Sequence, residues 1–179
     1  MSKNIASEIK RIISLQQQAI QNEDLSSAKM REDRIQRAIH LISSNKEKIV
    51  EALQNDFGYK DQGEILLSEI FGTINTLKYS RKHIKSWMQD CKRQSLQPFK
   101  FLGARTYVKY QPLGSVGVIV PWNFPINLCF GPLGSIFAAG NRVVIKPSEI
   151  APHTANLIQE LIGVFYDETE ATVFTGDSS

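Results

Sequence analysis

The chain has 179 residues, enough for one domain with a sizeable hydrophobic core, and 42% of them are apolar. Its net charge of +3 is too small, and its basic residues too mixed with acidic ones, to predict nucleic-acid binding. The sequence has no apolar run long enough to span a bilayer and no secretory signal, and its two cysteines, Cys91 and Cys129, do not make a disulfide framework. It therefore predicts a cytoplasmic protein that does not act at a membrane.

Four amphipathic helices are predicted in the first hundred residues, from apolar residues that recur at a 3.6-residue period. The predicted ranges are 4–22, 27–42, 44–58 and 61–88. Ser44 with Glu47, and Asp61 with Glu64, have the spacing of a capping box, and Gly58 is placed to end the third helix.

The long fourth helix is expected to bury one face. That face consists of Leu67, Ile70, Phe71, Ile74, Leu77, Ile84 and Met88. No cluster of polar residues in this helical half suggests chemistry, so its expected role is packing.

After residue 104 the pattern changes to that of an α/β protein. A half-exposed strand is predicted at 105–111, and a buried strand, covered on both faces, at 116–120. A helix at 126–139, a strand at 142–145, a helix from Pro152 and a third strand at 172–174 follow. The predicted organisation is a helical region at 1–104, a strand lead-in at 105–113 and the first part of a parallel, Rossmann-like sheet at 114–179.

The third strand leads into the turn Thr175-Gly176-Asp177, close to the last residue. Three parallel strands with two crossover helices leave an apolar edge without a partner. We therefore expect the sequence to be the front portion of a larger protein, or a truncated product.

Polar residues follow two of the predicted strands. Asn123 lies in the corner Pro121-Trp122-Asn123-Phe124-Pro125, where an amide can donate to a developing oxyanion or can merely satisfy the backbone of the turn. Lys146-Pro147-Ser148-Glu149 follows the next strand, where an acidic residue binds ribose hydroxyls in dinucleotide-binding folds or favours the start of a helix. Ligands of open α/β sheets bind at this edge, so we expect Asn123 and Glu149 to lie at the same rim.

Other chemistry is not predicted. No G-x-G-x-x-G loop follows a strand, and the three histidines are scattered singly without metal-ligand spacing. Cys129 lies on an apolar helix without a nearby base, which is typical of a buried small side chain rather than a nucleophile.

The two motifs, together with Ala-Gly-Asn-x-Val-Val ahead of Lys146, resemble those of the aldehyde dehydrogenase superfamily, and the similarity extends over most of the chain. The chain is most similar to the branch that acts on coniferyl, fatty and aromatic aldehydes, for which a homodimer is implied. In this family a cysteine thiolate attacks an aldehyde, hydride passes to NAD(P), and a glutamate activates the water that releases the acid.

The resemblance implies a role for each matching residue. Asn123 would be the oxyanion donor. The residues implied in cofactor binding are Val120, Pro121 and Trp122 along the cofactor path, Lys146, Ser148 and Glu149 at the adenosine ribose, and Gly176 near the adenine. The family's nucleophile motif Gly-Gln-x-Cys and its Glu-Leu-Gly-Gly motif are missing from these 179 residues.

Three functions remain open at this point. The first is a portion of an aldehyde dehydrogenase that uses NAD, with NADP disfavoured by the charge of Glu149. The second is a non-catalytic dimerising module that uses the helices and the edge of the strand at 105–111. The third, a free-standing nucleotide binder, is the least favoured.

Overall fold

The computed structural model describes residues 2–22 and 26–176 of the chain. The helices are α1 (Ser2–Asn22), α2 (Ala28–Ser44), α3 (Lys46–Phe57), α4 (Gln62–Glu64), which continues through a π-helical segment (Ile65–Phe71) into α5 (Gly72–Trp87), α6 (Pro125–Ala138) and α7 (Pro152–Phe165). The strands are β1 (Cys91–Arg93), β2 (Thr106–Val108), β3 (Ser115–Ile119), β4 (Arg142–Lys146) and β5 (Ala171–Val173). Asp177 of the predicted final turn lies outside the described residues.

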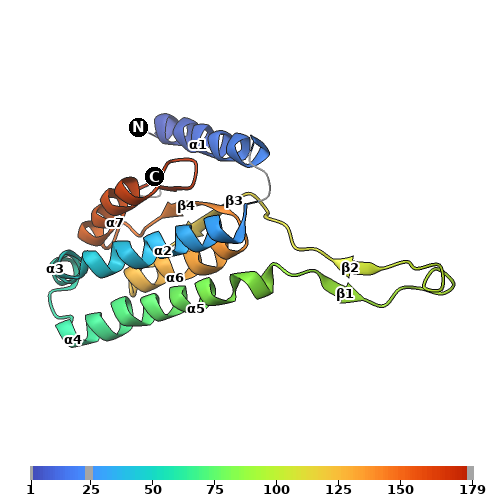
Figure 1. Ribbon diagram of the computed structural model, residues 1–179. Helices are drawn as coiled ribbons and strands as arrows, with labels where there is room; N and C mark the ends of the chain where they lie inside the picture. Colours follow the sequence, from blue (N-terminus) through green and yellow to red (C-terminus); the bar gives the residue numbers. More distant parts are fainter. Residues whose placement is uncertain (1, 23–25, 177–179) are drawn as a thin grey trace.

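A parallel sheet with the order β3-β4-β5 forms the centre of the described fold (Figure 1). Ser115 pairs with Arg142 and Ile119 with Lys146, and Ile145 pairs with Val173 on the next strand. Because α6 and α7 connect successive parallel strands, they are the crossover helices of two βαβ units. The predicted α/β fold with a parallel sheet is confirmed.

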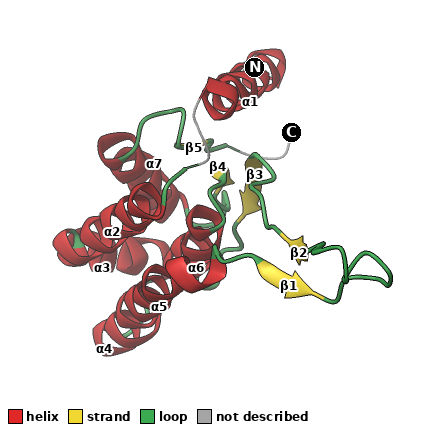
Figure 2. Cartoon of the chain, turned by 45° about the vertical axis from the view of Figure 1, so that its right-hand side comes forward, coloured by secondary structure: helices red, strands yellow, loops and turns green. Residues whose placement is uncertain are grey.

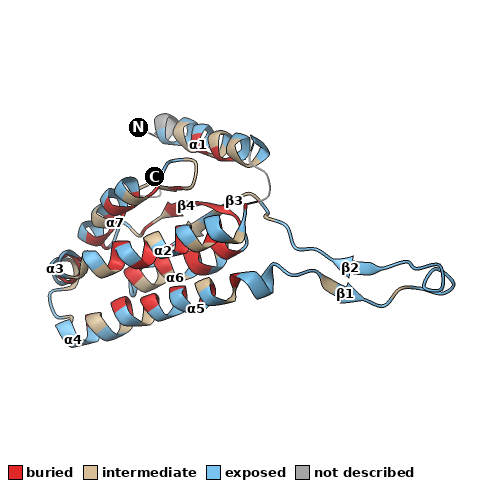
Figure 3. Ribbon diagram, in the orientation of Figure 1, coloured by how far each residue is buried: buried red, intermediate tan, exposed pale blue. Residues whose placement is uncertain are grey.

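Helices from the first half of the chain pack on these crossover helices rather than forming a separate body. α2 and α5 pack on α6, and α3 packs on α7, while α1 lies over the other face of the sheet (Figures 1 and 2). The Gln16 side chain anchors α1, because its Nε2 donates to the carbonyl oxygens of Val143 and Glu168, each at 3.1 Å. One hydrophobic core joins Ile35 of α2 to Val173 of β5 (Figure 3). The boundaries predicted at residues 104 and 113 mark changes of pattern along the sequence, and they stay a prediction.

The strand β3 differs from its prediction. It is not covered on both faces, because Ile119 is 87% exposed and Val116 and Val118 are only half-buried. Within the described residues β3 pairs with β4 alone, so it is an edge strand of this sheet.

The fourth helix buries part of the predicted face, namely Ile70, Ile74, Leu77 and Ile84, but not all of it. Leu67 is 72% exposed, and Phe71 and Met88 are exposed as well, whereas Glu69 is fully buried. The π-helical segment is the reason, since Gly72 N–H donates to the Leu67 carbonyl five residues back and the wider turn shifts the buried face.

Two helix starts were predicted from capping boxes, and only one is confirmed. The Asp61 side chain accepts hydrogen bonds from the N–H groups of Gly63 and Glu64. The Ser44 prediction is wrong: its hydroxyl donates back to the His40 carbonyl, and α3 begins after Asn45.

Residues 91–111, here called the hairpin arm, extend away from the helices (Figure 1). β1 and β2 pair antiparallel in it, with Lys92 opposite Tyr107. The strand predicted at 105–111 is thus confirmed over Thr106–Val108, although these residues are exposed rather than half-exposed.

Candidate active and cofactor site at the carboxyl edge of the sheet

The chain leaves β3 through a corner that is fixed by backbone contacts. Val120 N–H donates to the Lys146 carbonyl at 3.0 Å, and the Val120 side chain is buried in the core. Pro121 follows without a backbone donor, so the ladder stops there. Trp122 and Asn123 are exposed, and the Trp122 ring lies 6.3 Å from that of Phe57. The corner therefore presents Asn123 at the surface of the sheet edge.

The chain leaves β4 through a turn that carries a charged pair. Lys146 Nζ donates to Glu149 Oε2 at 3.1 Å and to the Pro147 carbonyl at 2.7 Å. Ser148 Oγ accepts from the N–H of Ile150 and so shapes the same turn. About half of the Glu149 side chain remains exposed, which leaves its carboxylate accessible to a ligand.

The register of the sheet brings these two turns to one edge. Ile119 and Lys146 are paired partners on parallel strands, so Asn123 and Glu149 follow neighbouring strands in the same direction. The expected placement of the two residues at a common rim is confirmed. Gly176, exposed and with a φ of 123°, follows β5 at the same edge.

Two residues from the helical half reach the Asn123 corner, and the sequence reading missed both of them. Glu69 Oε2 accepts from the N–H groups of Ile126 and Asn127, at 3.2 and 3.0 Å. Lys60 Nζ donates to the Asn123 carbonyl at 3.0 Å and to Glu69 Oε1 at 2.7 Å. The expected packing role of residues 1–100 therefore includes polar contacts to this corner. No sequence signal was available for Glu69, because in a regular helix it lies away from the predicted apolar face.

Cys129 is not placed to act as a nucleophile. It is fully buried in α6, and burial raises the pKa of its thiol, which keeps the group protonated. The prediction of a buried structural cysteine is confirmed. Cys91 is half-buried at the base of the hairpin arm, and no three potential metal-ligating side chains gather anywhere in the described residues.

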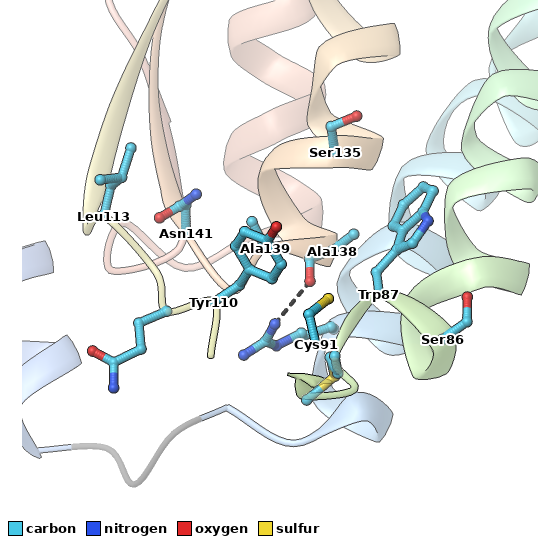
Figure 4. Close-up of a pocket in the computed structure, with 12 residues that line it drawn as sticks. Ser86, Trp87, Cys91, Tyr110, Leu113, Ser135, Ala138, Ala139 and Asn141 are labelled. Carbon is cyan, nitrogen blue, oxygen red and sulfur yellow. Dashed lines mark hydrogen bonds between the residues drawn. The ribbon is translucent and has the colours of Figure 1, made fainter. Parts of the chain in front are cut away.

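A concave region lies at the other end of α6 (Figure 4). This cavity of 560 Å³ is bounded by Trp87, Cys91, Tyr110 and Leu113 and by residues at the end of α6, and the Arg31 guanidinium donates there to the Ala138 carbonyl at 2.8 Å. Because α6 runs antiparallel to the strands, its end lies at the amino edge of the sheet. The cavity is therefore separated from Asn123 by the length of α6.

A parallel sheet with crossover helices and polar turns at its carboxyl edge is typical of the open α/β proteins that bind ligands at that edge. The chain belongs to the aldehyde dehydrogenase family, whose model matches residues 1–168.

The similarity is found in sequence and in structure. The chain is 46% identical to the coniferyl aldehyde dehydrogenase of Pseudomonas sp. (strain HR199 / DSM 7063) over 153 residues, which is 86% of this chain and 31% of that protein. The substrate-bound structure of Staphylococcus aureus AldH superposes with a TM-score of 0.87 at 30% identity, covering 94% of this chain and 36% of that one. The P. syringae indole-3-acetaldehyde dehydrogenase in complex with NAD+ gives a TM-score of 0.79 at 26% identity, covering 96% and 34%. The chain thus spans about a third of the length of these relatives.

The donor set at the edge fits a nucleotide cofactor. A half-exposed carboxylate can accept two ribose hydroxyls, and the Lys146 ammonium beside it can donate to a ribose or phosphate oxygen.

No helix among the described residues is long and apolar enough to cross a membrane.

Proposed function

We propose that this chain supplies the oxyanion donor and the adenosine-ribose site of an NAD-dependent aldehyde dehydrogenase. The observation that carries the proposal is the register of β3 and β4, because it brings Asn123 and the Lys146–Glu149 pair to one edge of the sheet. The similarity to a coniferyl aldehyde dehydrogenase supports an aromatic aldehyde as the substrate.

Each proposed role follows from the chemistry of the side chain. The Asn123 amide would donate to the aldehyde oxygen as negative charge develops on it. Glu149 would accept the ribose hydroxyls, and its charge disfavours the 2′-phosphate of NADP. Ser148 would keep this turn in shape, while Trp122, Pro121 and Gly176 would border the cofactor path. NAD, when bound, supplies the hydride acceptor.

We expect the 179 residues by themselves to oxidise no aldehyde. Cys129 is buried with a raised pKa, so it offers no thiolate at the carboxyl edge. In this proposal the nucleophilic cysteine and the general base come from the portion of its relatives that the chain does not match.

The test is to assemble an enzyme from residues 1–179 and the remaining two-thirds of the Pseudomonas coniferyl aldehyde dehydrogenase. In this assembled enzyme Asn123→Ala should lower kcat for coniferyl aldehyde by about 100- to 1,000-fold, because one oxyanion donor is lost. The binding of NAD, measured by calorimetry, should be unchanged.

Asn156→Ala is the matched control, since Asn156 is an exposed asparagine on α7. It should keep the kcat of the parent enzyme. A kcat for Asn123→Ala equal to that of Asn156→Ala would refute the proposed role of Asn123.

A dimerising role is also favoured by a specific observation. The hairpin arm exposes several large apolar side chains, namely Leu96, Phe99, Phe101, Leu102 and Tyr107. Exposed apolar surface of this kind marks an interaction site, and we propose that a second copy of the chain covers it. The same interface would serve a homodimeric cytoplasmic enzyme or a non-catalytic module of this fold.

A further inference from the structure

We infer that Lys60 and Glu69 are positioning residues that fix the Asn123 corner from outside the sheet. The inference rests on the proposed function, because it assigns to this ion pair the orientation of the proposed oxyanion donor. It gives the helical half of the chain a part in catalysis that goes beyond packing.

Glu69 holds the segment that follows Asn123. Its carboxylate is fully buried, and Oε2 accepts from the first free N–H groups of α6, those of Ile126 and Asn127. These groups have no partner within the helix, so the carboxylate satisfies them and also meets the positive end of the helix dipole. The first free N–H group of α6, that of Ile126, is thereby fixed three residues after Asn123.

Lys60 holds Asn123 itself. Its ammonium group donates to the Asn123 carbonyl at 3.0 Å and to Glu69 at 2.7 Å, and only 8% of its side chain is exposed. It also lies 4.7 Å from the centre of the Phe124 ring and 4.9 Å from that of Phe57. The ammonium is thus fixed on several sides, and it fixes the Asn123 carbonyl in turn.

The π-helical segment is what directs Glu69 inward. In the regular register expected from the sequence, Leu67 and Phe71 would face the core, but the wider turn exposes both and buries Glu69. Segments of this kind are frequent at functional sites. Neutral pairs often replace a buried ion pair without loss of stability, so stability alone gives little reason to place these charges here.

The test measures kinetics in the assembled enzyme described above. Glu69→Gln is nearly isosteric and should lower kcat by roughly ten- to a hundredfold, as expected for a small displacement of a catalytic group. The KM for NAD should stay within about twofold, because the lost interaction acts in the transition state. Lys60→Met should also lower kcat. Lys60→Arg keeps the positive charge and should therefore have a higher kcat than Lys60→Met.

Two controls separate positioning from stability. Glu170→Gln also removes a carboxylate that is paired with arginines, but one that is partly buried and lies at the amino end of β5, and it should leave kcat per folded molecule unchanged. The double variant Lys60→Met/Glu69→Gln makes the pair neutral. It should regain the free energy of unfolding that the single variants lose, while its kcat should stay low.

A readout that does not depend on activity uses the 179-residue chain. Nuclear magnetic resonance relaxation of the Asn123 side-chain amide should show greater mobility in Glu69→Gln and no change in Glu170→Gln. An inactive but folded assembled enzyme would count against the proposed function, while the relaxation data would still decide the positioning role. Recovery of kcat in the neutral double variant, or an unchanged Asn123 amide in Glu69→Gln, would overturn the inference.

Discussion

At the scale of single residues, Glu170 is the acidic group whose titration the structure perturbs most clearly. Burial alone would raise the pKa of its carboxyl, but hydrogen bonds from Arg37 and Arg34 outweigh burial and lower the pKa to about 2. Arg37 reaches both carboxylate oxygens, at 2.7 and 2.9 Å, and Arg34 donates at 2.8 Å. Arg37 also stacks on the buried Tyr166 ring, so the cluster ties α2 to the start of β5.

This cluster predicts an acid-sensitive contribution to stability. The usual pKa of the group is 4.5, so the contribution is complete above that value and is lost as the pH falls from about 4.5 to about 2. Its size is about 3 kcal/mol in the free energy of unfolding. Urea unfolding followed by circular dichroism between neutral pH and about pH 2 should show this loss in the parent chain and a much flatter curve in Glu170→Gln. Equal pH dependence in both proteins would contradict the assignment.

At the scale of elements, the contact between α5 and α6 depends on a glycine. A Cβ added at Gly134 would lie 2.7 Å from Ser80 Oγ and 3.1 Å from Ser80 Cβ, which is too close for either atom. The helices therefore approach each other through a residue without a side chain, in the second half of α6.

Gly134→Ala should destabilise the chain by about 1–3 kcal/mol, because the overpacking exceeds the gain in helix propensity. Gly163→Ala is the matched control: this glycine of α7 has no atom within 4 Å of an added Cβ, and its substitution should stabilise the chain by about 0.5–1 kcal/mol. Thermal unfolding of the two variants measures the difference. Ser80→Ala should recover part of the loss in Gly134→Ala, and a stabilising Gly134→Ala would show that the two helices move apart easily.

The elements also show what the sequence can predict. α2, α3 and α7 follow a regular 3.6-residue period, and their predicted apolar faces are largely buried. In the fourth helix the burial of Ile74, Leu77 and Ile84 could be predicted, but that of Glu69 could not, because the π-helical segment changes the period without a distinctive residue. β1 lies in a charged segment without alternation, and its pairing with β2 becomes apparent only in three dimensions.

The candidate site likewise contains residues that the sequence could place and residues that it could not. Asn123 and Glu149 could be placed together because each directly follows a parallel strand, and the edge is fixed by the order of the elements. Lys60 and Glu69 could not be placed, since 63 and 57 residues separate them from the corner groups that they bind. Contacts over such separations depend on how helices pack on the sheet, which the local pattern does not specify.

At the scale of the whole molecule, the hairpin arm is the feature that the rest of the described fold leaves uncovered (Figure 3). Phe101 and Leu102, near its tip, are 85% and 81% exposed. Exposed rings and aliphatic chains gathered on a projecting segment favour association, because covering them removes apolar surface from water.

The last prediction concerns this arm. Replacing residues 95–104 by a short Asn-Gly turn should convert a dimer of the chain into a monomer, because the apolar tip that a second copy covers is removed. Sedimentation equilibrium gives the mass of each protein, and circular dichroism verifies that the helices of the core persist. Val164→Ser is the matched control, since Val164 is an apolar residue of α7 that is 73% exposed and lies outside the arm. It should remain dimeric. A monomeric parent chain, or a dimer that survives the shortening of the arm, would show that the second copy binds elsewhere or not at all.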